Sequence, residues 1–220
     1  MVLDALSMTE CVQPFLMHCH LRHYPPKSAI IRQGERADAL FYLINGSVAV
    51  VLEDEKGHEI VLAYLNGGEF FGEIGLFAED GHRSALVRAR SECEVAQISY
   101  AKLRTLTELY PRLVTCMTAQ LARRLRNTNR KLGDLAFMDV YGRVARTLLD
   151  LSHQPDSMTH PKGMQISVTR QELARLVGCS REMVGKVLKE MENHQQVSVA
   201  GKNIVLLGIR HCGTRHLHAV

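Results

Sequence analysis

The first hundred residues alternate short apolar runs with turn residues. Runs rich in Val, Ile, Leu, Phe and Tyr occupy 39–44, 46–52, 59–65, 84–90 and 93–98, and turn segments such as Glu55–His58 and Asn66–Gly68 separate them. Short apolar runs bounded in this way are typical of strands in an all-β sandwich or barrel. We therefore predict an antiparallel β-domain, flanked by helices at 8–17 and 100–108.

A long helix is predicted to follow this β-domain. Pro111 is a favoured first residue of a helix, and the chain then has neither Pro nor Gly until Gly133. Along this segment a narrow stripe recurs at spacings of four and three, at Leu121, Leu125, Thr128, Leu132 and Leu135. Such a stripe is typical of a two-stranded coiled coil, so we expect a homodimer. Thr128 is its one polar member, where it could set the register or contact something buried.

The segment 169–191 has the pattern of a helix-turn-helix. Thr169 and Ser180 are favoured N-caps, and Gly178 suits the left-handed end of the first helix. The second helix carries one apolar stripe, formed by Val184, Val187, Leu188 and Met191. The segment 197–207 then reads as a β-hairpin, so the pattern predicts a winged helix-turn-helix.

The second helix of such a motif presents its first turns to base edges in the major groove of double-stranded DNA. Arg181 has the fork that reads guanine, and Glu182 can accept a hydrogen bond from cytosine. We therefore predict DNA contacts from Thr169, Arg170, Gln171, Ser180, Arg181, Glu182 and Lys186. The alternative is a helical hairpin with a solvated polar face, in which Glu182 and Lys186 only pair with each other.

The charge distribution favours DNA binding. Residues 1–137 hold 16 Lys+Arg and 16 Asp+Glu, whereas residues 138–220 hold 11 and 7, so the net charge of +4 lies in the last third. A basic segment attached to a neutral one suggests a polyanionic partner. The chain has no apolar stretch of membrane-spanning length and no basic N-terminal signal, so we expect a cytoplasmic protein. Six cysteines without a C-x-x-C pair predict reduced thiols and no metal site.

A glycine-rich segment, Gly68–Phe77, precedes Arg83 and Ser84. Glycines let backbone N–H groups approach an anion, and a short helix starting near Gly72 would add its positive end. Arg83 can hold a phosphate through two hydrogen bonds, and Glu73 can accept from a sugar hydroxyl. These residues predict a ribose joined to a phosphate as the ligand. No nucleophile–base pair or metal-ligand spacing accompanies them, so we expect no enzymatic activity.

Residues 18–210 resemble the family of the cyclic AMP receptor protein, also called catabolite activator protein. Segments 72–77 and 83–85 resemble its phosphate-binding cassette, 119–125 its dimer helix, 135–140 its hinge and 169–182 its DNA reader. The resemblance implies an α+β fold. Its parts would be a cyclic-nucleotide-binding β-roll (jelly-roll) with flanking helices over 1–110, a dimerisation helix and hinge over 111–137, a winged helix-turn-helix over 138–210, and a disordered tail over 211–220.

The resemblance also implies cyclic AMP as the allosteric effector. Its ribose and cyclic phosphate would be bound by Gly72, Glu73, Arg83 and Ser84, Arg124 would approach from the dimer helix, and Thr128 would bond the adenine. That last role accounts for the polar residue in the apolar stripe. Asn129 stands where the family has a serine that reaches the partner subunit's ligand. Some relatives in plant-associated bacteria respond to cyclic di-GMP, but the intact Glu73 and Arg83-Ser84 favour cyclic AMP.

Finally, the resemblance implies activation of transcription through RNA polymerase. An exposed loop would contact the polymerase α-subunit through Thr159, His160 and Gly163, and a second surface would comprise His20, Arg22 and Lys102. Lys186 stands where the family usually has an arginine that reads guanine, so we expect the outer half of a TGTGA-like half-site to be read less strictly. A nucleotide-binding module without DNA function is the remaining alternative.

Overall fold

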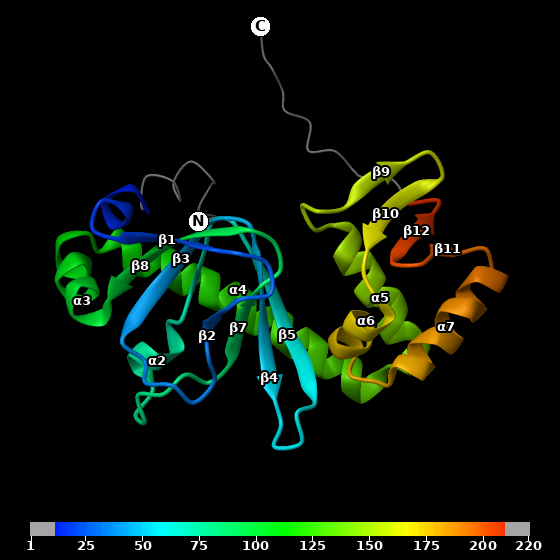
Figure 1. Ribbon diagram of the computed structural model, residues 1–220, viewed down its shortest axis with the longest axis horizontal. Helices are drawn as coiled ribbons and strands as arrows, with labels where there is room; N and C mark the ends of the chain where they lie inside the picture. The colour runs from blue at the N-terminus through cyan, green and yellow to red at the C-terminus, as the bar shows by residue number, and fades with distance from the viewer. Residues whose placement is uncertain (1–11, 210–220) are drawn as a thin grey trace, which may run out of the picture. The chain divides into compact units, whose positions relative to one another are not determined.

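The computed structural model describes residues 12–209 of the chain (Figure 1). The chain divides into two compact units, of which the first ends at Lys131 and the second begins at Leu132. This division falls inside one long helix. The domain boundaries expected from the sequence, with segments 1–110, 111–137 and 138–210, therefore remain predictions. The predicted tail at 211–220 lies outside the described residues.

Two antiparallel sheets of four strands each form the first unit. One has the order β1 (His20–Tyr24), β8 (Cys93–Ser99), β3 (Ala39–Asn45) and β6 (Glu69–Phe71). The other has the order β2 (Ala29–Ile31), β7 (Leu86–Ala89), β4 (Ser47–Glu53) and β5 (Glu59–Asn66). The five predicted runs coincide with β3, β4, β5, β7 and β8, and the predicted antiparallel β-domain is confirmed.

Neighbouring residues of a strand point to opposite faces, and this places the core on both sides of the first sheet. Phe71 belongs to an apolar cluster that draws residues from both sheets, where its ring stacks on Phe41. Phe70 belongs to a second cluster, shared with the helices α3 (Tyr100–Leu109) and α4 (Arg112–Phe137). One short strand, β6, therefore contributes to both parts of the core.

The predicted helices are present among the described residues. The segments predicted at 100–108 and from 111 onward are α3 and α4, and residues 12–16 of the segment predicted at 8–17 are helical. The helix predicted near Gly72 is a single turn, α2 (Ile74–Phe77). Within the described part of the chain, no helix combines the length and the apolar character that crossing a bilayer requires.

The second unit is a winged helix-turn-helix, as predicted. Its helices are α5 (Val140–Ser152), α6 (Arg170–Val177) and α7 (Arg181–Asn193). Its sheet has the order β11 (Val197–Ala200), β12 (Asn203–Leu207), β10 (Gly163–Ser167) and β9 (Met158–His160). The prediction of an exposed loop with Thr159, His160 and Gly163 was wrong in part, because residues 158–160 form β9 on the edge of β10. A run of three residues shows no alternation, so only its pairing with β10 makes it a strand.

A break separates α4 from α5 where a hinge is predicted. Helix α4 ends at Phe137 and α5 begins at Val140. The Asp139 carboxylate between them accepts from the N–H of Gly142 at 2.8 Å and so caps α5. The break is thus built into the local sequence, and movement about it stays a prediction.

The turn between α6 and α7 depends on a glycine whose replacement is informative. Gly178 has a φ of +71°, in the left-handed region that other residues adopt at a cost. We expect Gly178→Ala to lower the free energy of unfolding by about 1 kcal/mol, measured by urea denaturation. The matched control is Gly185→Ala inside α7, where an added Cβ meets nothing within 4 Å. That change should raise stability by up to about 1 kcal/mol, and an equal effect of both variants would contradict the assigned turn.

Candidate functional site

A cavity of about 350 Å³ lies in the first unit, between the second sheet, the end of β6 and α4. Its apolar wall includes Val50, Leu62, Ala63, Tyr64, Phe71, Leu121 and Leu125. Its polar lining includes Gly72, Glu73, Arg83, Ser84, Arg124 and Thr128. The structure thus brings together six of the seven residues predicted for nucleotide binding. Asn129 is exposed and is not among the lining residues.

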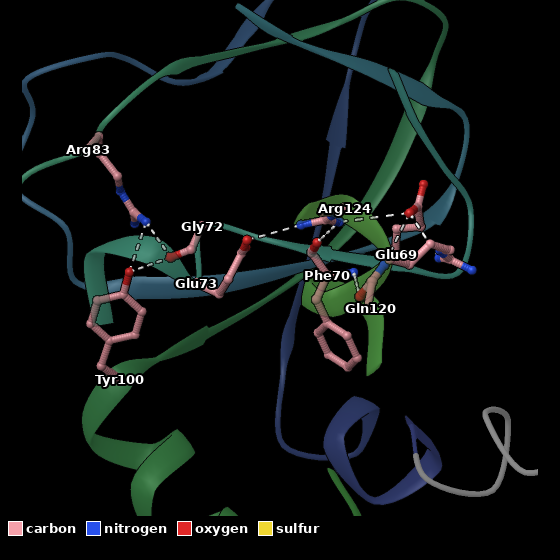
Figure 2. A network of polar contacts seen from close by, with 9 residues as sticks. Glu69, Phe70, Gly72, Glu73, Arg83, Tyr100, Gln120 and Arg124 are labelled. Carbon is pink, nitrogen blue, oxygen red and sulfur yellow. Dashed lines mark hydrogen bonds and ion pairs between the residues drawn. The ribbon is translucent and has the colours of Figure 1, made fainter. Parts of the chain in front are cut away.

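Glu73 and Arg124 form a buried ion pair at this cavity. The Glu73 residue is only 6% exposed, and Arg124 Nη1 donates to its Oε1 at 3.1 Å (Figure 2). The other terminal nitrogen of Arg124 donates to the carbonyl of Phe70. The Arg124 Nε is buried and has no hydrogen-bond partner in the described part of the chain. The site therefore offers a carboxylate whose charge is balanced and one donor still to be satisfied.

Arg83 is 7% exposed and is held by the protein itself, whereas the sequence suggested a side chain free to bind phosphate. Its Nη1 donates to the carbonyl of Gly72 at 3.0 Å, and its Nη2 donates to that of Ala39 at 2.8 Å. A buried guanidinium needs such partners, since an unpaired buried charge is costly. Together with a bond to Tyr100, these contacts use three of the five N–H donors of arginine, so donors remain on Nη2 and Nε.

Tyr100 is part of the site although the sequence analysis did not select it. Its hydroxyl donates to the carbonyl of Gly72 at 2.5 Å and accepts from Arg83 Nη1 at 3.0 Å (Figure 2). Burial raises the pKa of Tyr100, so the phenol keeps the proton that it donates. Gly72 has a φ of +81°, and a Cβ there would lie 2.8 Å from Arg83 Nη1. A glycine is therefore required where the two donors converge.

Two further polar residues of α4, Asn127 and Lys131, line the cavity and were also missed. Lys131 Nζ donates to the carbonyl of Leu62 on β5 at 2.8 Å. With Arg124 and Thr128 they follow the spacing i, i+3, i+4 and i+7, which places them on one helix face. That spacing is visible in the sequence and could have identified them once Arg124 and Thr128 were selected.

The helix-turn-helix has the predicted caps. Thr169 Oγ1 accepts from the N–H of Glu172 at 3.1 Å, and Ser180 Oγ accepts from that of Met183 at 3.2 Å. The stripe of Val184, Val187, Leu188 and Met191 is buried, as predicted. The side chains of Arg170, Gln171, Arg181, Glu182 and Lys186 are exposed. Since each capping hydroxyl uses its oxygen as an acceptor, its O–H can still donate to a phosphate.

The residues predicted to contact a polymerase have different environments. His20, Arg22, Lys102 and Thr159 are exposed, and His160 is half-buried. Gly163 is buried, which differs from the expectation of an exposed loop. A Cβ at Gly163 would lie 1.8 Å from the carbonyl oxygen of Leu206, because β12 packs directly against it. Gly163 can shape the β9–β10 hairpin, but it offers little surface to a partner.

Four of the six cysteines belong to the described residues, and all four are free thiols. Burial raises the pKa of Cys19 to about 12 and also raises that of Cys179. Cys93 and Cys116 are buried. Free thiols at these four positions agree with the predicted reduced cysteines; Cys11 and Cys212 lie outside the described residues.

Comparison with known families assigns both halves of the chain. Residues 21–110 match the cyclic nucleotide-binding domain family, and residues 142–210 match the Crp-like helix-turn-helix domain family. The first match contains the cassette with Glu73 and Arg83, and the second contains α6 and α7. The two matches correspond to the two sites described above.

Several known proteins are similar over nearly the whole chain. The cAMP-activated global transcriptional regulator CRP of Escherichia coli is 53% identical over 210 residues, which are 96% of this chain and all of that protein. The cAMP-activated global transcriptional regulator Vfr of Pseudomonas aeruginosa is 57% identical over 198 residues, 89% of this chain and 92% of that protein. These relatives are transcription regulators and not enzymes, in agreement with the expectation from the sequence.

A solved structure agrees with the fold. The c-di-GMP responsive global regulator CLP of Xanthomonas campestris is 45% identical and superposes with a TM-score of 0.86, covering 91% of this chain and 99% of that chain. With a cyclic nucleotide-binding domain before a Crp-like helix-turn-helix domain, and about half of its residues identical to these relatives, the chain belongs to the CRP/FNR family of transcription regulators.

Proposed function

We propose that this chain is a cyclic AMP-dependent, DNA-binding transcription regulator, mainly an activator, that acts as a cytoplasmic homodimer. The observation that carries the proposal is the single cavity that gathers Glu73, Arg83, Ser84, Arg124 and Thr128 in a chain with an exposed DNA-reading helix. The names of two relatives that are 53% and 57% identical support cyclic AMP as the effector.

Cyclic AMP brings an anionic cyclic phosphate, a ribose and an adenine to the cavity. The remaining donors of Arg83 and the hydroxyl of Ser84 would hold the phosphate. Glu73 would accept from the ribose hydroxyl while Arg124 balances its charge, and the buried Nε of Arg124 would gain an acceptor. Thr128 would bond the adenine, whose faces suit the apolar wall. Asn129 would act toward the nucleotide of the partner subunit.

Cyclic di-GMP is the alternative effector, since the Xanthomonas campestris protein is described as responsive to it. Two arguments favour cyclic AMP. The proposed phosphate site has one buried arginine, Arg83, which suits the single phosphate of cyclic AMP. Cyclic di-GMP would bring a second phosphate to the cavity. The cavity of about 350 Å³ is also near the lower end of ordinary ligand sites.

A homodimer is supported by the exposed leucines of α4. Leu132 and Leu135 are 65% and 46% exposed and continue the stripe of Leu125, which is 62% exposed. Cyclic AMP bound against this helix would shift the population of two conformations of the dimer. In the active one, the two α7 helices would stand about 34 Å apart, one turn of DNA. Movement about 137–139 would set that distance.

Contacts with RNA polymerase complete the proposal. The exposed His20, Arg22 and Lys102 would form one contact surface, and Thr159 and His160 on β9 would face the α-subunit. Gly163 would act indirectly by allowing the β9–β10 hairpin to pack against β12.

Nucleotide-dependent DNA binding is the main test. We expect cyclic AMP to strengthen retardation of a palindromic TGTGA-containing duplex by about 5- to 150-fold in a gel-shift titration, a range typical of coupled sites. Ser84→Ala should weaken cyclic AMP binding about five- to tenfold in calorimetry, because one hydrogen bond is lost.

Ser84 is a cleaner position than Arg83 for this test. It is exposed and makes no hydrogen bond with the described residues, whereas the Arg83 guanidinium also holds Gly72 and Ala39. The matched control is Ser198→Ala on β11, which should leave nucleotide affinity unchanged. Equal retardation with and without cyclic AMP would contradict the proposal, and a response to cyclic di-GMP alone would favour the alternative.

Base reading can be tested at Lys186. Lysine keeps the charge of an arginine but lacks the fork that contacts guanine twice. Sites selected from random DNA should therefore be less constrained at the Lys186 position than at the Arg181 position. Lys186→Arg should restore a strict preference there, with about 1–3 kcal/mol of added discrimination. A wild-type preference that is equally strict at both positions would disprove this reading.

Dimerisation through α4 can be tested with two carboxylates. Leu132→Glu buries a charge in the predicted interface and should give monomers at micromolar concentration in sedimentation. Arg126 follows Leu125 in the sequence but is not part of the leucine stripe, and it is exposed. Arg126→Glu therefore introduces the same carboxylate outside the predicted interface and should leave the dimer intact. Dimers of the Leu132→Glu protein would show that α4 is not the interface.

A further inference from the structure

Strand β6 leads directly into the phosphate-binding cassette, which begins at Gly72, and this strand lies at the edge of its sheet. In the described part of the chain β6 pairs only with β3, with Phe70 opposite Tyr42. In an antiparallel pair, alternate residues turn their N–H and C=O groups away from the neighbouring strand. Phe70 is such a residue, since both of its backbone groups bond to side chains of α4 instead.

Two side chains of α4 act on Phe70 as a neighbouring strand would. Gln120 Oε1 accepts from the N–H of Phe70 at 3.0 Å, and Arg124 donates to its carbonyl (Figure 2). The two residues are four apart and therefore lie on one helix face. We call this arrangement the Phe70 clamp.

Gln120 is buried, although its side chain is polar. It is 3% exposed, and its Nε2 donates to Glu69 Oε1 at 3.3 Å. The amide oxygen faces an N–H donor and the amide nitrogen faces a carboxylate, so the network sets its orientation. A buried amide with both ends satisfied ties β6 firmly to α4.

The short segment from Phe70 to Gly72 is held at both of its ends. The Phe70 ring is 1% exposed and packs on Phe15, with centroids 5.2 Å apart. Two residues later, Arg83 and Tyr100 hold the carbonyl of Gly72. The carboxylate of Glu73 therefore extends from a backbone whose position depends on α4.

We propose that Gln120 is the positioning residue that couples α4 to the nucleotide cassette. Arg124 also reaches Glu73 and lines the cavity, so a bound nucleotide can change its contacts. Gln120 does not line the cavity, so a nucleotide there does not compete with Phe70 for its amide oxygen. A shift of α4 is therefore passed to Glu73 through the Phe70 amide, and a nucleotide bound at Glu73 acts on α4 by the same route.

This inference rests on the proposed response to cyclic AMP, and its test uses the coupling itself. The quantity measured is the ratio of DNA dissociation constants without and with saturating cyclic AMP. Gln120→Met keeps the length of the side chain but loses both hydrogen bonds. We expect it to reduce this ratio about fivefold or more and to speed hydrogen exchange of the Phe70 amide. Lower stability alone would not change the ratio in a folded protein.

A double substitution tests the network directly. Gln120→Glu combined with Glu69→Gln keeps an acceptor for Phe70 and reverses the side-chain hydrogen bond at unchanged net charge. The exchange gives up the ion pair of Glu69 with Arg123, whose side chain is largely exposed, so that this pair contributes little. The double variant should retain the wild-type ratio of DNA dissociation constants. It therefore still tests the proposal if Gln120→Met does not fold. Arg126→Met, an exposed change on the same helix, is the control and should leave the ratio unaltered.

The outcomes separate the two proposals. Wild-type protein without a cyclic AMP response would overturn the proposed function and this inference with it. A wild-type response that Gln120→Met leaves unchanged would overturn the inference alone. Loss of coupling in the folded double variant would overturn it as well.

Discussion

Buried charges need partners, and this constraint organises the nucleotide site. Glu73 and Arg83 are 6% and 7% exposed, and a charge buried to this degree without partners would be costly. Glu73 is paired with Arg124 of α4, and Arg83 is held by the carbonyls of Gly72 and Ala39. The charged groups that suit a nucleotide are therefore bonded to the sheet and to the long helix at the same time.

Helix α4 has two roles because its faces differ. Its first half packs into the core of the first unit through Leu113 and Met117, and there Gln120 and Arg124 hold the edge strand β6. Further along, Leu132 and Leu135 are left exposed, which suits contact with a second subunit. One helix thus carries both the residues of the candidate nucleotide site and the proposed dimer interface.

The DNA-reading unit depends more on local signals. Thr169 and Ser180 cap α6 and α7, and Gly178 adopts the left-handed conformation between them. These contacts span three or four residues, so the sequence indicates them directly. The exposed Arg181 and Lys186 follow from the buried stripe on the opposite face of α7. The strand β9 was missed, because only pairing with β10 defines it.

The sequence alone determined five strands of the β-domain, the wing hairpin, the long helix and the helix-turn-helix, because periodicity and caps are local. With the glycine-rich motif and the family resemblance, it also selected six residues that line the candidate nucleotide site. It did not reveal that Arg83 is already bonded within the protein, that Tyr100 holds Gly72, or that Gln120 holds Phe70. Those contacts join residues 11, 28 and 50 positions apart. Only the tertiary structure decides them, since no spacing rule relates a buried donor to an acceptor on a distant element.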